Sequence, residues 1–207
     1  MGKLKEVYTY YKESNRGYIN TVNLTKDWYN AINESNYKDN SVLKFKSNTI
    51  FEIGKIYKFK YIPILKDKLL FYDLQPLILY LGIDENNLYN GINLNLLPIK
   101  FRENFLDKIY TKFYREINRE IFRFPMDSKK QSPLSIKYDI LEKIFKIDYF
   151  KFAYRTYYFS NMKNITVFSY ENWYRILYLE DYKFKKQNVK QIYKLFNTYF
   201  KNKSKIR

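Results

Sequence analysis

The sequence predicts an α+β fold: a small, mostly antiparallel sheet with several packed helices and an amphipathic, basic C-terminal helix. Residues 50–97 alternate apolar and polar side chains or break at Gly and Pro, as strands and turns do. After residue 98, apolar side chains recur every three to four residues, as in helices. Grouped strands followed by grouped helices are typical of α+β proteins. With 207 residues, the chain can form one core of domain size.

Composition divides the chain into three parts. Residues 1–48 are polar, rich in Asn and aromatic, and are predicted to form an N-terminal extension or arm. Residues 49–184 are predicted to form a single α+β core domain, and residues 185–207 a basic C-terminal helix and tail. Within the first part, Thr25 is predicted to be the N-cap of a helix, because a Thr side chain can accept a backbone N–H at that position.

The first strand of the core is predicted from residue 53 to residue 61. Strand alternation places its aromatic side chains on one face: Tyr57, Phe59 and Tyr61. The lysines between them, Lys58 and Lys60, then point outward to solvent.

Two further extended segments follow. Residues 76–81 form a short apolar run that suits a buried strand, and residues 84–87 have the composition of a turn. Residues 89–97 are predicted to be extended, and Pro98 marks the boundary with the helical part.

The helical part begins at Pro98, since proline is tolerated in a first helical turn. Its apolar residues step by four until Pro125, and residues 132–145 are predicted to form another helix. Residues 154–159 and 165–168 are predicted to form a hairpin, with Ser169 as the N-cap of the helix that follows.

Charge is concentrated at the C-terminal end. The chain has 38 Lys and Arg against 21 Asp and Glu, a net charge of +17. We expect part of this excess to reflect AT-rich codons, which also encode the abundant Asn, Tyr, Ile and Phe. Residues 183–207 nevertheless contain nine basic residues and no acidic one, and residues 189–200 have the apolar period of an amphipathic helix.

The tail has three interpretations: a packed helix with a solvated Lys face, a surface that contacts DNA phosphates or an acidic subunit, and a basic helix on a membrane surface. We rank the membrane last. The candidate nucleic-acid-binding residues are Lys185, Lys186, Lys190, Lys194, Lys201, Lys203, Lys205 and Arg207.

Missing residue types restrict the chemistry. The chain has no His and no Cys, which excludes Ser-His-Asp triads, Cys nucleophiles, Cys/His zinc sites and disulfides. Its five glycines are too far apart to form a phosphate-binding loop. We therefore predict no enzyme, no cofactor and no metal site. The sequence has no apolar run of 18 residues and no apolar leader, and we expect an intracellular or particle-bound protein.

Several motifs resemble a known family. They comprise residues 57–63, Tyr72-Asp73 with Pro76 and Leu77, residues 91–98 followed by Arg102, and a later group around Arg155 and Trp173. Over about residues 53–184, the chain resembles a family of small virion proteins of large tailed bacteriophages, often labelled DNA end protectors or virion structural proteins. Asn95 replaces a usual His of that family, and Phe71 replaces a usual Pro.

Nine motif residues are expected to have structural roles: Tyr72, Asp73, Pro76, Gly91, Asn93, Pro98, Arg102, Arg155 and Trp173. Asp73 is expected to accept backbone N–H groups in a turn. Gly91 is expected to supply a positive φ or a close backbone approach. Arg102 is expected to fork onto carbonyls or onto a carboxylate such as Asp73.

The resemblance implies a non-enzymatic virion structural protein. Our leading hypothesis is a connector, neck-ring or tail-assembly subunit at the head–tail junction, which forms a homo-oligomeric ring and contacts the portal and neighbouring ring or tail proteins. The alternative is a virion protein that binds and protects the ends of packaged duplex DNA. A weaker one is a scaffold or cargo protein inside the head. The expected location is the virion, or the host cytoplasm during assembly, without a membrane partner.

Overall fold

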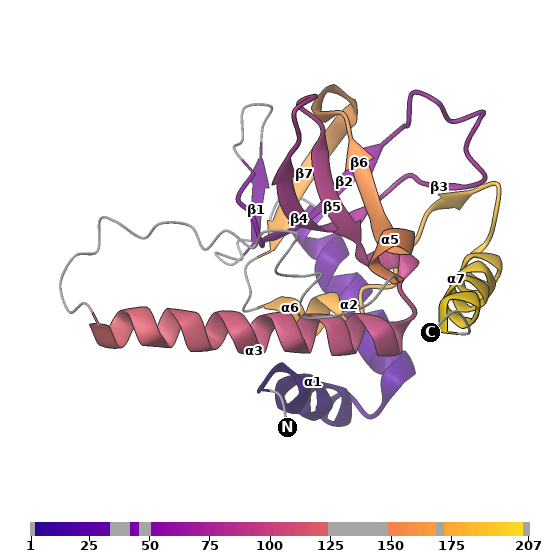
Figure 1. Ribbon diagram of the computed structural model, residues 1–207. Coiled ribbons are helices and arrows are strands. Elements are labelled where there is room, and N and C mark those ends of the chain that lie inside the picture. The colour runs from indigo at the N-terminus through magenta and orange to yellow at the C-terminus, as the bar shows by residue number, and fades with distance from the viewer. Residues whose placement is uncertain (1–2, 34–41, 46–50, 124–148, 169–171, 205–207) are drawn as a thin grey trace.

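A six-stranded antiparallel sheet forms the centre of the computed structural model, with helices against one of its faces (Figure 1). The structure describes residues 3–33, 42–45, 51–123, 149–168 and 172–204. Helices and a mostly antiparallel sheet share one chain, so the predicted α+β class is confirmed.

The strands pair in the order β1-β7-β2-β4-β5-β6, and every neighbouring pair is antiparallel. Their bounds are β1 Val42–Phe45, β2 Ile56–Tyr61, β4 Leu77–Ile83, β5 Tyr89–Asn93, β6 Tyr154–Tyr157 and β7 Met162–Phe168. A separate two-stranded sheet pairs β3, Tyr72–Asp73, with β8, Phe184–Lys185.

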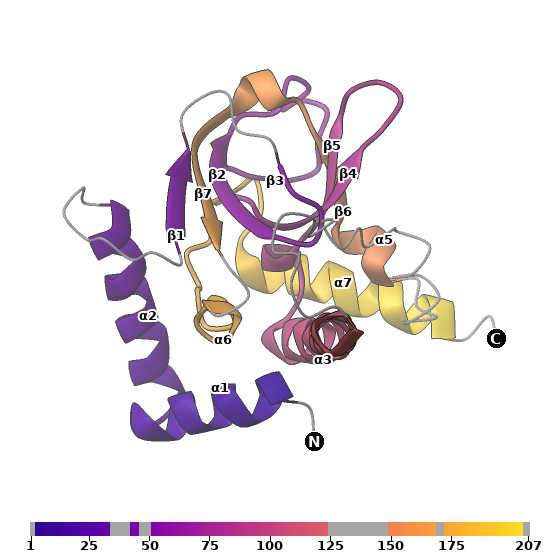
Figure 2. The ribbon, with the colours of Figure 1, turned by 90° about the vertical axis from the view of Figure 1, so that its left-hand side faces the viewer.

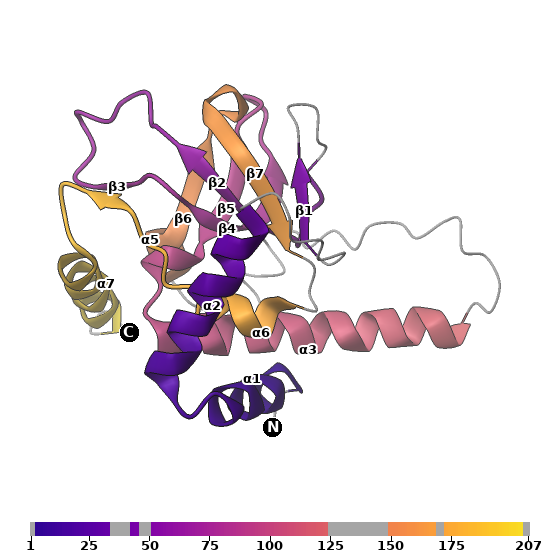
Figure 3. The same cartoon turned by 180° about the vertical axis from the view of Figure 1, so that it is seen from behind.

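Six α-helices lie within the described residues: α1 Lys3–Ser14, α2 Tyr18–Asn33, α3 Ile99–Arg123, α5 Tyr149–Ala153, α6 Trp173–Ile176 and α7 Val189–Ser204. Two 3₁₀ turns connect elements: η1 Leu94–Leu96 and η2 Phe159–Asn161. In Figure 1, α1, α3 and α6 lie below the sheet. Figure 3, the view from behind, shows α2 in front, between the lower end of β7 and α1.

The sheet buries a different core on each face. One face packs against the helices, and its cluster contains Ile56, Leu79 and Ile92 from strands and Phe105 and Phe196 from helices. The other face bends over a second cluster, which contains the predicted aromatic face of β2: Tyr57, Phe59 and Tyr61. Because both faces of the sheet are covered, most apolar residues of its central strands are buried, and Ile83 at the end of β4 is exposed.

The sheet bends far enough to bring β2 and β6 close together, although two strands lie between them in the pairing order (Figure 2). The Tyr61 and Tyr157 rings lie 5.0 Å apart, and the Tyr158 backbone N–H donates to the Tyr61 hydroxyl at 3.3 Å. The predicted hairpin of residues 154–168 is therefore wrong. β6 pairs with β5 and β7 pairs with β2, so η2 crosses the open side of the bent sheet.

The N-terminal helix boundary also differs from the prediction. Thr25 lies inside α2 and is fully buried, and the helix begins seven residues earlier at Tyr18. Gly17, with φ of 110°, separates α1 from α2 and accepts a hydrogen bond from Thr21 through its carbonyl. A glycine in this conformation carries no Cβ strain, which lets the chain turn sharply there.

The other predicted elements agree with the structure where it describes them. The predicted strands at 53–61 and 76–81 correspond to β2 and β4, and the helix after Pro98 corresponds to α3. The Asp84 side chain caps the predicted turn by accepting the Asn86 and Leu88 N–H groups. The segment 89–97 is extended only through Asn93 and then forms η1. Pro125, the predicted helix 132–145 and the Ser169 N-cap lie outside the described residues.

The helices of the proposed arm and tail share the main core. Tyr8 of α1, Tyr29 and Ile32 of α2, and Ile192 and Phe196 of α7 all belong to the cluster under the sheet. The division into 1–48, 49–184 and 185–207 stays a prediction, because shared packing does not show where a folding unit begins.

Candidate functional site

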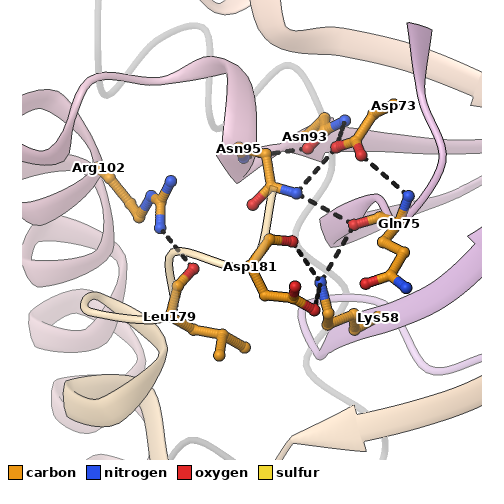
Figure 4. Close-up of polar contacts among 8 residues, drawn as sticks. All are labelled: Lys58, Asp73, Gln75, Asn93, Asn95, Arg102, Leu179 and Asp181. Carbon is orange, nitrogen blue, oxygen red and sulfur yellow. Dashed lines mark hydrogen bonds and ion pairs between the residues drawn. The ribbon is translucent and has the colours of Figure 1, made fainter. Parts of the chain in front are cut away.

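Asp73 is the centre of a buried polar cluster beside β3 (Figure 4). Its carboxylate accepts the Gln75 backbone N–H at 2.9 Å, which is the turn role expected from sequence. It also accepts the side-chain amides of Asn95 at 2.8 Å and Asn93 at 3.2 Å. Asn95 thus donates to this carboxylate through its side-chain amide.

Lys58 lies beneath this cluster and is 1 % exposed, so the prediction that it points to solvent is wrong. It shares a face with Ile56, and the helices cover that face. Its ammonium donates to the carbonyls of Asp181 at 3.2 Å and Gln75 at 3.3 Å, and lies 3.4 Å from the Asp181 carboxylate. Burial lowers the pKa of Lys58, and the charges of Asp181 and Asp73 oppose that shift.

Arg102 is fully buried one turn into α3. Its guanidinium donates to the carbonyls of Leu94 at 3.0 Å, Leu177 at 3.4 Å and Leu179 at 3.5 Å, and to the Tyr182 hydroxyl at 3.1 Å. The expected fork onto carbonyls is confirmed, whereas Asp73 bonds to the two asparagines instead. Arg102 therefore joins η1 to the segment after α6.

Five of the nine motif residues line one pocket of about 370 Å³: Tyr72, Asp73, Pro76, Asn93 and Arg155. One wall of the pocket comes from Leu69 and Leu70, and β6 forms another. The Arg155 guanidinium donates to the Phe152 and Tyr154 carbonyls, and burial lowers its pKa. Arg155 thereby ties β6 to the end of α5 beside the pocket.

Three further motif residues, Gly91, Pro98 and Trp173, have structural roles and do not line the pocket. Gly91 pairs with Arg155 across β5 and β6, and a Cβ at Gly91 would lie 2.9 Å from the Leu79 carbonyl. Of the two expected roles, the close backbone approach is the one observed. The Pro98 carbonyl accepts the Phe101 and Arg102 N–H groups in the first turn of α3, and Trp173 lies in the helical core.

The predicted basic residues lie along β8 and α7 and in the segment between them. Lys185, Lys190, Lys194 and Lys201 are exposed. Lys186 is also exposed, and its ammonium donates to the Asp67 and Leu69 carbonyls at 2.9 and 2.8 Å. The structure describes the backbone of Lys203 in α7 but not its side chain, and Lys205 and Arg207 lie outside the described residues.

Sequence reasoning missed the hydrogen-bond and ion-pair partners of Lys58 and Arg102 that lie far away along the chain. Asp181, which contacts Lys58, and Tyr182, which contacts Arg102, lie 123 and 80 residues away from them. One signal was available for Lys58, because residues in the middle of a strand that point to the helix-covered side of a sheet are usually buried.

Groups that would indicate a metal site or a membrane span do not occur in the part of the chain that the structure describes. No cluster of three metal-ligating side chains is found there, and none of the described helices is long and apolar enough to cross a bilayer.

The comparisons with known proteins give one match. The sequence profile of the family described as Phage T4 terminal DNA protecting protein matches residues 10–124, from the second half of α1 through the end of α3. No curated protein and no solved structure matches the chain. The match begins well before residue 53, so the end of α1 and all of α2, which the sequence motifs left out, lie within it. Because the profile covers more than half of the 207 residues, the chain belongs to the Phage T4 terminal DNA protecting protein family.

Proposed function

We propose that this protein binds the ends of duplex DNA and shields them, as a non-enzymatic component of a phage particle. The observation that carries the proposal is the family match, since the family is described by the protection of terminal DNA. Shielding an end requires no chemistry. It requires a protein that binds the phosphates near the end and occupies the space a nuclease needs.

Three lysines of α7 provide the phosphate-binding surface, and we call Lys190, Lys194 and Lys201 the basic stripe. Their spacing of four and seven residues keeps them within an arc of about 40° on the helix, over a length of about 16 Å. Ile192 and Phe196, on the opposite side of the same helix, are fully buried. The core thus holds α7 in one orientation and presents the basic stripe to solvent.

Residues near α7 add to the positive charge of the basic stripe. Lys183 and Lys185 of the preceding segment are exposed as well, and residues 183–207 contain no acidic side chain. Neutral salt would screen such a surface strongly, because each phosphate contact releases counterions when it forms. Binding should therefore weaken steeply as the salt concentration rises.

A variant that replaces the charged side chains with neutral ones tests the proposal more cleanly than a truncation, because removing α7 would also remove Ile192 and Phe196 from the core. The triple variant Lys190→Gln, Lys194→Gln, Lys201→Gln keeps the helix and removes three charges. We expect the slope of log K against log salt for a linear duplex to become shallower by about 2 to 3. Protection of that duplex from an exonuclease should fall in parallel.

The matched control is Lys12→Gln, Lys26→Gln, Lys100→Gln, which removes three lysines of α1, α2 and α3. This control should retain the salt slope and the protection of the unaltered protein. If both variants lose the same amount of salt slope and of exonuclease protection, only net charge matters. That result would refute the role of the basic stripe as the phosphate-binding surface. A protein that binds no linear duplex at all at low salt would refute DNA-end binding itself.

The connector, neck-ring and tail interpretations, with their ring of subunits and portal contacts, stay predictions without support from the family match. The same holds for the scaffold or cargo role. The location proposed here is the end of the packaged DNA in the virion, reached from the host cytoplasm during assembly.

A further inference from the structure

The loop of residues 62–71, between β2 and β3, exposes more aliphatic surface than any comparable stretch of the described residues. Ile62 is 61 % exposed, Ile64 and Leu65 are 59 % exposed, and Leu70 is 67 % exposed. Figures 1 and 3 show this loop extending away from the sheet on the side where β8 leads into α7. An ordered cluster of exposed aliphatic side chains indicates a binding surface.

Neighbouring elements hold the loop in place. The Lys186 ammonium donates to the Asp67 and Leu69 carbonyls, and the Asn161 side-chain amide donates to the Ile62 carbonyl at 3.0 Å. Within the loop, the Lys68 N–H donates to the Leu65 carbonyl at 3.0 Å and closes a turn. These bonds use backbone carbonyls, so they leave the aliphatic side chains facing outward.

Lysines surround the aliphatic side chains. Lys66 and Lys68 lie within the loop and are exposed, and Asp67 is the loop's only acidic residue. Lys60 and Lys163 lie opposite each other on β2 and β7 at the base of the loop, and both are exposed. A partner that complements this surface has an apolar face bordered by negative charge.

We propose that loop 62–71 caps the open end of a DNA duplex, with Ile64, Leu65 and Leu70 against the outer face of the terminal base pair and the lysines against the last phosphates. The inference rests on the proposed function and explains how an end is distinguished from the interior of a duplex. Phosphates are the same at both places, so the basic stripe alone cannot distinguish them.

The physical basis of this discrimination is the cost of exposing a base. Inside a duplex, an aliphatic side chain reaches a base face only after two base pairs have unstacked. At an end, the outer face of the last base pair is already open to water. Aliphatic contacts therefore add affinity at ends and none along the interior.

The test compares a blunt linear duplex with a covalently closed circle of the same sequence, using the full chain. The variant Ile64→Ser, Leu65→Ser, Leu70→Ser should lower the preference for the linear form by about tenfold or more, because the three aliphatic side chains no longer bury apolar area against the base pair. Its affinity for the circle should not change. The basic-stripe variant should instead weaken binding to both forms.

The matched control replaces three aliphatic residues that are exposed elsewhere: Ile19→Ser, Leu24→Ser, Ile83→Ser. The preference of this control for the linear form should equal that of the unaltered protein. A second variant, Leu65→Trp, adds a ring that stacks on bases. Its fluorescence should be quenched by the linear duplex and not by the circle, measured against the unaltered protein with its Trp28 and Trp173.

Two results would overturn the capping role while leaving DNA binding intact. One is an end preference that survives the serine substitutions in the loop. The other is a Leu65→Trp signal that responds equally to the circle, or responds to anionic phospholipid vesicles instead of DNA. An unaltered protein that binds neither DNA form would refute the proposed function first, so the two failures are distinguishable.

Discussion

Lys58 is a buried cation whose carboxylate partner, Asp181, remains partly exposed. Asp181 keeps about 28 % of its side chain in solvent, whereas Lys58 keeps 2 %. Removing Asp181 leaves an uncompensated buried charge, but replacing Lys58 leaves a carboxylate that water can still reach. We therefore predict that Asp181→Ala lowers the free energy of unfolding by about 1–3 kcal/mol and that Lys58→Met lowers it by less.

Urea unfolding of the two single variants and the double variant measures this asymmetry. The double variant should be more stable than Asp181→Ala alone, because it also removes the buried charge of Lys58. The interpretation fails if Lys58→Met lowers the free energy of unfolding more than Asp181→Ala does. That order would mean that the hydrogen bonds of the Lys58 ammonium stabilise the fold more than its buried charge destabilises it.

Residue roles that depend on neighbours in the sequence were predictable, and those that depend on distant contacts were not. Asp73 and Gln75 lie two residues apart, and their turn follows from the chemistry of Asp. The carbonyls that Arg102 binds include Leu177 and Leu179, which the chain brings from more than 70 residues away. The sequence therefore indicated the type of bond that Arg102 makes and could not indicate most of its partners.

At the scale of elements, α7 has two faces with separate roles. Phe196 is fully buried and packs against Phe101 at 4.9 Å and Phe152 at 5.5 Å between ring centroids. We predict that Phe196→Ala lowers the free energy of unfolding by about 3–4 kcal/mol, through lost burial and the cavity left behind. Asn197→Ala, at the neighbouring exposed position, should change it by less than about 0.5 kcal/mol.

Urea or thermal unfolding measures both changes, and a DNA-binding assay at a temperature where both variants are folded completes the comparison. Phe196→Ala should then retain the salt slope of the unaltered protein, because the basic stripe remains on the opposite face. A Phe196→Ala variant as stable as the unaltered protein would show that α7 is not anchored in the core.

Element periodicity predicted α3 and α7 because each has one apolar stripe repeated over many turns. It misjudged the start of α2, where polar Thr21 and Thr25 are fully buried within a helix that already begins at Tyr18. It also joined β6 and β7 as a hairpin, because strand pairing in a bent sheet depends on distant strands. Local patterns give the type of an element, whereas its partners come from the whole chain.

At the scale of the whole molecule, both cores depend on tyrosines that are buried in their neutral form. Burial raises the pKa of Tyr57, in the cluster inside the bent sheet, from 10.0 to about 12. Burial, together with the charge of Glu103, raises the pKa of Tyr178 in the helical core to about 12. Each core therefore contains a phenol that resists ionisation while the chain is folded.

We predict that the free energy of unfolding is unaffected by these phenols below pH 10 and falls as the pH rises from 10 to 12. In that window the unfolded chain has lost phenolic protons that the folded chain keeps, so the slope is negative, at most about 1.4 kcal/mol per pH unit for each tyrosine. The lowered pKa of Lys58 acts with the opposite sign, below its ordinary value of 10.5.

Urea unfolding across this window, with tyrosinate absorbance followed in parallel, measures the effect. Tyr57→Phe should make the slope shallower, because it removes one of the phenols with a raised pKa and leaves the ring stacked on Phe51 at 4.0 Å. Its lost bond from the Glu52 N–H shifts the whole curve downward without changing the slope. A free energy of unfolding that stays level from pH 10 to 12 would mean that solvent reaches these phenols in the folded chain, and that neither core is closed around them.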